Sequence, residues 1–213
     1  MNRTLSTLMR TAFLPAAALL ACSTTLAATL TYTTVLTGAA EDTPNASPGT
    51  GTATLVLDDI ARSLSLDVAF GGLLGTVTAA HIHCCTTSAG TGTAGVVTVT
   101  PTFTGFPAGV TSGSYNRLFD MTVSAGSWNT GLTAFLNGTH GGNTTTAFAA
   151  LVTRLDEGKA YLNIHTNQFP GGEIRGFFNR VPEPSTAWLL LPALLGGLVT
   201  ARRRAPAAGR QVV

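Results

Sequence analysis

Charged side chains are scarce in this chain of 213 residues, where Asp, Glu, Lys and Arg together make up 10%. The formal net charge of +2 comes from the two ends, because the segment from Ala28 to Arg180 holds nine acidic and six basic residues. A nucleic-acid-binding domain needs a basic face, and a segment with a net charge of −3 offers none. The sequence therefore predicts that no nucleic acid is a partner.

Motifs for nucleophilic or phosphate chemistry are also missing. No Ser/His/Asp or Cys/His arrangement can be assembled with any specificity, and no glycine-rich loop has phosphate-binding spacing. Glu173 has no obvious second carboxylic acid for glycoside hydrolysis, because Asp156 and Glu157 lie in a predicted helix-to-strand turn. We therefore expect a protein that is not an enzyme.

The N-terminal apolar run, Ala12–Ala21, is too short to span a bilayer by itself. It follows Arg3 and Arg10 and is followed by small residues up to Ala27, a pattern that predicts a signal peptide over residues 1–27. A lipoprotein signal is the alternative, since Leu-Leu-Ala-Cys at 19–22 resembles a lipobox. In both cases we expect the protein to be exported.

Residues 181–213 carry a second targeting pattern. An apolar stretch, Ala187–Thr200, lies between a Pro-Glu-Pro motif and three arginines: Pro182, Glu183, Pro184, Arg202, Arg203 and Arg204. This arrangement resembles the PEP-CTERM sorting signal. The resemblance implies a Gram-negative bacterium that makes extracellular polysaccharide, transient insertion of the helix in the inner membrane with the arginines on the cytoplasmic side, and cleavage near the motif by an exosortase. A permanent single-pass anchor is the alternative.

Between the ends, residues 28–180 predict one all-β domain. Short strands separated by Gly- and Pro-rich turns, with one late helix, predict an antiparallel two-sheet β-sandwich. Thr102–Ser114 is expected to be a long loop packed by its aromatic residues, and Asn143 to cap a helix over Thr144–Leu155. Strands are expected at Thr29–Leu36, Thr52–Leu57, Ser63–Phe70, Val77–His83, Gly95–Thr100 and Tyr115–Val123.

The segment Ala160–Phe178 carries an unusual set of polar residues on two short strands around a Pro-Gly-Gly turn. Alternation predicts that Leu162, Ile164 and Ile174 point inward. The opposite side would then be a polar face made of Tyr161, Asn163, His165, Glu173 and Arg175. Glu173 and Arg175 are two apart on one strand, so we expect them to approach each other in a structural role.

Two stretches, AHIH at 80–83 and YLNIHTNQFPGGEIRG at 161–176, resemble the signature segments of the CHRD domain, named after chordin. The resemblance covers roughly Ala28 to Asn179. It implies an immunoglobulin-like β domain, distantly similar to copper-zinc superoxide dismutases, without implying a settled activity. The four histidines, at 81, 83, 140 and 165, are too few for a two-metal centre of the dismutase kind. Cys84 and Cys85 stand where many relatives have a Gly-Pro-like turn.

The His-x-His pair at 81 and 83 is a candidate metal site, because both imidazoles point the same way from one strand. His165 would join them if its strand lies beside Val77–His83, with Glu173 or Asn163 as a further ligand or a supporting residue. Copper or zinc is the cofactor that this set would hold. A purely structural hydrogen-bonding network and a polar ligand site are the alternatives.

Cys84 and Cys85 would be the only thiols after removal of the signal peptide. In an oxidising compartment we expect them to form a vicinal disulfide. Metal ligation beside His81 and His83 is the alternative.

Two functional hypotheses remain. The first is a non-enzymatic module at the cell surface or in the extracellular matrix, which binds polysaccharide or a surface protein, or contributes structure. The second is a copper- or zinc-dependent redox or metal-handling protein. A calcium-stabilised adhesin has only Glu41-Asp42 and Asp58-Asp59 in its favour, and these lack the spacing of a known calcium loop.

Overall fold

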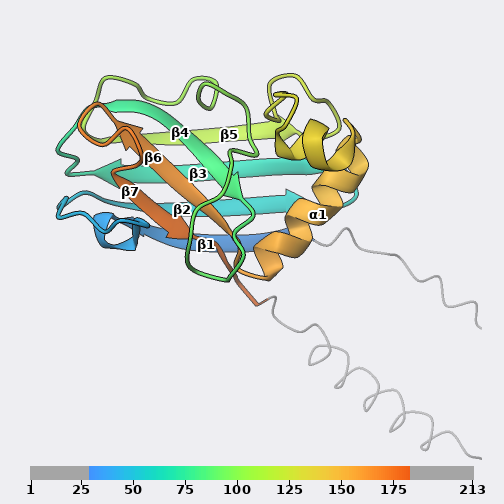
Figure 1. Cartoon of the computed structure of the whole chain (residues 1–213), viewed down its shortest axis with the longest axis horizontal. Coiled ribbons are helices and arrows are strands. Elements are labelled where there is room, and N and C mark those ends of the chain that lie inside the picture. The colour runs from blue at the N-terminus through green and yellow to red at the C-terminus, as the bar shows by residue number, and fades with distance from the viewer. Residues whose placement is uncertain (1–28, 183–213) are drawn as a thin grey trace, which may run out of the picture.

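The computed structural model describes residues 29–182, so the predicted signal peptide, Glu183, Pro184 and the arginines at 202–204 lie outside the described residues. The described chain is built mainly of antiparallel strands with one α-helix (Figure 1). The strands are β1 (Thr29–Thr37), β2 (Thr50–Asp58), β3 (Ser63–Gly71), β4 (Val77–Cys84), β5 (Gly113–Asp120), β6 (Ala160–Thr166), β7 (Ile174–Phe177) and β8 (Asn179–Arg180). The helices are the 3₁₀-helix Gly38–Ala40, the π-helix Phe135–Thr139 and α1 (Thr144–Asp156).

The strands are ordered β4-β6-β7-β1-β2-β3-β5, with β8 paired to β1. β4, β6 and β7 run at an angle across β1, β2, β3 and β5 (Figure 1). The register joins the two groups through the pair Thr37–Arg175 of β1 and β7. The expected all-β, sandwich-like fold with one short helix is confirmed, with the two groups of strands belonging to one continuous curved sheet.

One hydrophobic core includes residues from both groups of strands. Leu64, Leu66, Val68 and Phe70 of β3, in the expected strand Ser63–Phe70, alternate with more exposed residues, and all four are buried. Ile82 of β4 and Leu162 of β6 are fully buried in the same core. Burial of each such side chain contributes about 1.5–3 kcal/mol relative to leaving it exposed.

Helix α1 begins at the predicted cap. The Asn143 side chain accepts hydrogen bonds from the backbone N–H groups of Thr145 and Thr146, at 3.0 and 3.1 Å. Phe148, Leu151 and Leu155 share one face of the helix and are buried, and Val152 packs partly buried against the same core. No helix among residues 29–182 has the length and apolar character to cross a membrane.

The prediction of a strand at Gly95–Thr100 is wrong. The segment makes only the isolated bridges His83–Val96 and Thr98–Trp128. Its hydrogen bonds are divided between two neighbours, since Val97 N–H donates to Ile82 O while Val99 N–H donates to Ser127 O.

The strand expected at Tyr115–Val123 ends earlier, at Asp120, whose carboxylate accepts hydrogen bonds from the backbone and side chain of Thr122. The aromatic-packed loop after Thr102 is confirmed by the burial of Phe103 and Phe106.

Candidate metal centre

The pairing of β4 with β6 brings the three histidines of the two signature stretches onto one face of the sheet. His81 lies opposite Asn163, His83 opposite Tyr161, and Ala79 opposite His165. Residues directly opposite in an antiparallel pair share a face, and the alternate residues Ile82, Leu162 and Ile164 face the hydrophobic core. The three histidines therefore lie on the side of β4 and β6 that points away from the core.

This outer face is covered by loops rather than by solvent. His81 and His83 are only 7% and 8% exposed, and His165 is partly buried. Each imidazole has one nitrogen within hydrogen-bonding distance of a backbone carbonyl. The pairs are His81 Nε2 with Pro101 O at 2.7 Å, His83 Nδ1 with Ala94 O at 2.9 Å, and His165 Nδ1 with Pro170 O at 3.0 Å.

These three hydrogen bonds define the tautomers. A carbonyl oxygen only accepts, so the nitrogen facing it must carry the hydrogen in each ring. The other nitrogen of a neutral imidazole is then an acceptor with a free lone pair. The lone pairs belong to His81 Nδ1, His83 Nε2 and His165 Nε2, which are buried and have no hydrogen-bond partner among the described residues.

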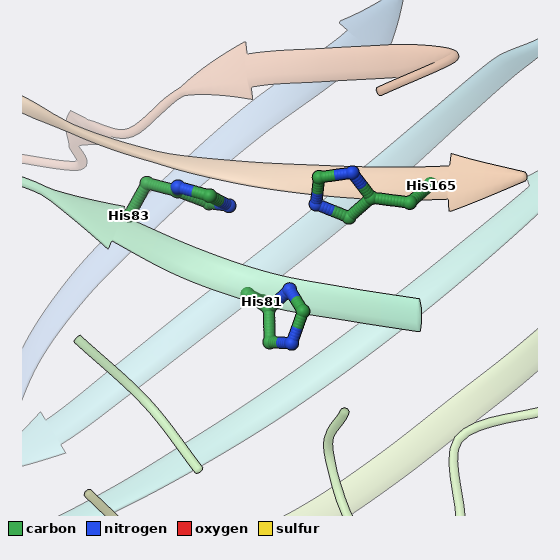
Figure 2. A group of neighbouring side chains, drawn as sticks. All are labelled: His81, His83 and His165. Carbon is green, nitrogen blue, oxygen red and sulfur yellow. The ribbon is translucent and has the colours of Figure 1, made fainter. Parts of the chain in front are cut away.

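The three rings are turned toward one another, with a nitrogen of each facing the space between them (Figure 2). One ligand atom from each ring lies within 4.8 Å of the others. Atoms at that spacing lie within roughly 2.8 Å of a common centre, so shifts of roughly 0.7 Å would reach the Zn–N distance of about 2.0–2.1 Å. The ring centroids are 5.4–5.8 Å apart.

Burial keeps these rings neutral. It lowers the pKa of both His81 and His83 to about 4, although the hydrogen bonds to Pro101 and Ala94 act in the opposite direction. Burial lowers the pKa of His165 as well. At neutral pH the three lone pairs are therefore available to a cation.

Asn163, Arg175 and Glu41 continue the polar face beyond the histidines. Asn163 lies between His81 on β4 and Arg175 on β7 in the sheet register. Its Nδ2 is 3.5 Å from Glu41 Oε2 and 3.4 Å from Gly171 O, and its Oδ1 has no partner among the described residues. Arg175 Nε is 3.7 Å from Glu41 Oε2. Burial raises the pKa of Glu41 to about 7 despite the nearby Arg175.

Tyr161 is enclosed between His83 and Arg175. Its ring stacks on His83 with centroids 4.9 Å apart and an interplanar angle of 7°, and the Arg175 guanidinium carbon lies 4.9 Å from the ring centroid. The backbone N–H of Ala94 donates to the Tyr161 hydroxyl at 3.2 Å. The backbone of Ala94 thus contacts both Tyr161 and His83.

A groove of about 630 Å³ begins beside His83. Its lining includes Glu41, Asp42, Tyr161, Asn163 and Arg175, together with residues of the turn that joins β6 to β7. The outer face is therefore connected to solvent on the side of Asn163 and Glu41.

The model for the CHRD domain matches residues 32–178. The chain belongs to the CHRD domain family. No curated protein and no solved structure matches this chain. The matched range contains both signature stretches, and these supply all three histidines of the CHRD domain's candidate metal centre. The family suggests an extracellular or secreted module, which agrees with the expected export.

Glu173 does not lie where the sequence predicted. The CHRD domain's β7 begins only at Ile174, so the alternation that assigned Glu173 to the polar face does not reach it. Its carboxylate is fully buried and accepts hydrogen bonds from Ser47 Oγ, Thr166 Oγ1 and the backbone N–H groups of Leu74 and Gly75. Arg175 instead forms its ion pairs with Glu41 and Asp42.

The remaining cysteines and histidine are not part of the three-histidine group. Cys84 and Cys85 form a disulfide, which removes the thiolates that metal ligation would need. The His140 ring packs against Phe135, with centroids 4.6 Å apart. The sequence linked Glu41 and Asp42 only to a calcium alternative, and it gave no sign of their contacts with Arg175 and Asn163 beyond an acidic pair near the start of a Pro- and Gly-rich loop.

Proposed function

We propose that this exported CHRD-domain protein holds one copper or zinc ion between His81, His83 and His165. The observation that carries the proposal is the set of three buried imidazole nitrogens that face one another without hydrogen-bond partners. An unsatisfied buried acceptor costs about 1–3 kcal/mol. A cation shared by the three nitrogens removes that cost, whereas a network of the histidines alone leaves it.

The surroundings of the rings support metal binding. Metal-binding histidines usually donate their second N–H to a carbonyl or carboxylate, which fixes the ring and its tautomer. His81, His83 and His165 each do so: the carbonyls of Ala94 and Pro101 belong to the β4–β5 connection, and that of Pro170 belongs to the β6–β7 turn. Three neutral imidazoles suit zinc and copper, whereas calcium and magnesium prefer oxygen ligands.

The two ends of the chain support the cellular part of the proposal. A signal peptide over residues 1–27 would export the domain, and the PEP-CTERM-like segment 181–213 would be processed by an exosortase after transient insertion in the inner membrane. The mature domain would then reside at the cell surface or in the extracellular matrix. There it would bind or carry metal beside polysaccharide or another surface protein, in a role that requires no enzymatic activity of its own.

Elemental analysis of the exported full chain tests the metal site. We expect about one equivalent of copper or zinc in the wild type, and loss of that metal in His81→Ala and in His165→Ala. His140→Ala is the matched control, because His140 lies outside the three-histidine group, and it should retain the metal. A metal-free wild type after export and after incubation with either ion would make the three histidines architectural and overturn the proposal.

A further inference from the structure

Only three protein ligands converge on the proposed ion. Within residues 29–182 the group of candidate ligands consists of His81, His83 and His165. Structural zinc sites are normally closed by four protein ligands, whereas sites that bind an exchangeable molecule use three and leave one position open. Ligand number therefore favours an open centre.

The surroundings show which side of the centre is open. The outer edges of the three rings are occupied by the carbonyls of Pro101, Ala94 and Pro170. On β6, Asn163 lies between Tyr161 and His165 and directly opposite His81, so it borders the space that the three rings share. No described residue donates a hydrogen bond to Asn163 Oδ1, although Asn163 is only 3% exposed. A water or hydroxide on the ion would supply that missing donor.

Asn163 also connects the centre to the groove. Asn163 and His83 both line the groove of about 630 Å³. Glu41, whose Oε1 likewise has no partner among the described residues, lines it next to Asn163. A small molecule in the groove would therefore lie beside both Asn163 and the ligand His83.

The charges of this region determine the kind of ligand. Three neutral imidazoles leave the two positive charges of the ion uncompensated. The two acidic residues that line the groove, Glu41 and Asp42, are offset in part by Arg175. The sum of ion and side chains is positive, so an anion is the favoured exogenous ligand.

We infer that the three-histidine centre is an open site whose free coordination position faces Asn163 and takes a small anionic ligand from the groove. The inference rests on the proposed function, because it requires an ion between His81, His83 and His165. It adds that the ion exchanges ligands with the surroundings of the protein and is not a purely structural metal.

Azide is a suitable probe, because its binding to copper(II) changes the visible absorption and the electron paramagnetic resonance spectrum. The full chain loaded with one equivalent of copper(II) would be titrated with azide. We expect a saturable change with a stoichiometry of one. If the chain binds no copper, the proposed function fails. If it binds copper but azide leaves both spectra unchanged, the centre is closed and only the present inference is overturned.

The variant Asn163→Asp tests the direction of the open position. A carboxylate at this place has nearly the size of the amide and can itself occupy the free position on the ion. We expect Asn163→Asp to retain copper and to bind azide at least about tenfold more weakly. Thr43→Ala, an exposed residue at the rim of the groove, is the matched control and should bind azide as the wild type does. Equal azide affinity in Asn163→Asp and wild type, with copper retained in both, would overturn the assignment to this side.

Discussion

At the scale of single residues, Gly172 determines how closely the β6–β7 turn approaches the polar face. Its φ of 134° lies in a region that non-glycine residues rarely adopt. A Cβ atom there would collide with the Asn163 amide and with Glu41 Oε1. The contact among Asn163, Glu41 and the turn therefore requires glycine.

We predict that Gly172→Ala lowers the free energy of unfolding by about 1–3 kcal/mol, because it combines backbone strain with displacement of Asn163 and Glu41. Urea denaturation would measure the change. Gly171→Ala is the matched control: a Cβ there meets no atom within 4 Å, so its stability should stay close to that of the wild type. Equal effects of the two substitutions would contradict the assigned contact.

Glu41 gives a second prediction at this scale, on pH. Its pKa rises from 4.5 to about 7 in the folded protein, so between these values the folded state holds more protons at this site than the unfolded state. The contribution of Glu41 to stability is therefore fully present below about pH 4.5 and is lost as the pH rises through about 7. The charged groups that face it are Arg175 of β7 and its neighbour Asp42.

We predict that Glu41→Gln raises Tm relative to the wild type at pH 8 and leaves it nearly unchanged at pH 4, because a neutral amide resembles the protonated acid. Thermal unfolding of the metal-free protein at the two pH values would measure this. A Tm difference between variant and wild type that stays the same at both pH values would show that folding does not raise the pKa of Glu41.

At the scale of secondary-structure elements, Glu173 links three parts of the fold. Its carboxylate accepts hydrogen bonds from Ser47, which precedes β2, from the Leu74–Gly75 segment that precedes β4, and from Thr166 at the end of β6. Burial acts to raise the pKa of Glu173, but these hydrogen bonds outweigh it and lower the pKa. The carboxylate is thus ionised and held by four donors.

We predict that Glu173→Ala destabilises the domain by about 3 kcal/mol or more, because several buried donors lose their acceptor at once. Glu173→Gln should have a smaller effect, since one amide oxygen still accepts. Glu157→Ala, which removes a carboxylate from solvent-exposed ion pairs, should leave the free energy of unfolding nearly unchanged. A loss in Glu173→Ala no larger than that in Glu157→Ala would contradict this linking role.

The elements also show how far sequence reasoning reaches. Local sequence patterns predicted the strands around Ser63–Phe70, Val77–His83 and 160–165, and the cap at Asn143, because each of these depends on residues close in the chain. A run of β-branched residues misled at Gly95–Thr100, where hydrogen bonds to two distant segments replace a ladder. Alternation failed at Glu173, because it holds only within a strand and β7 starts one residue later.

The candidate metal centre was predictable only in part for the same reason. His81 and His83 share a face by local geometry, but their closeness to His165 depends on the pairing of β4 with β6. The carbonyls of Pro101, Ala94 and Pro170 come from irregular loops, whose positions no periodic pattern reports. The tautomers, and with them the three free nitrogens, could therefore be assigned only from the structure.

At the scale of the whole molecule, the last contacts of the domain lie just before the predicted sorting motif. Strand β8, Asn179–Arg180, pairs with β1, and the N–H of Val181 donates to Thr31 O at 2.8 Å. Asp156, at the end of α1, accepts from both Arg180 and Tyr32. The segment around Arg180, two residues before Pro182, thus connects the helix to the first strand.

We predict that a chain ending at Pro182 unfolds at the same temperature as the exported protein, because processing near Pro182–Pro184 would leave these contacts intact. A chain ending at Phe178 should have a Tm lower by roughly 5 °C, the shift that about 2 kcal/mol produces in a domain of this size. Mass spectrometry of the protein recovered from its own host would give both ends, expected at Ala28 and near Pro182–Pro184. Recovery of a chain that still carries residues 185–213 would contradict the sorting prediction, and equal Tm values for the two truncated chains would contradict the role assigned to β8.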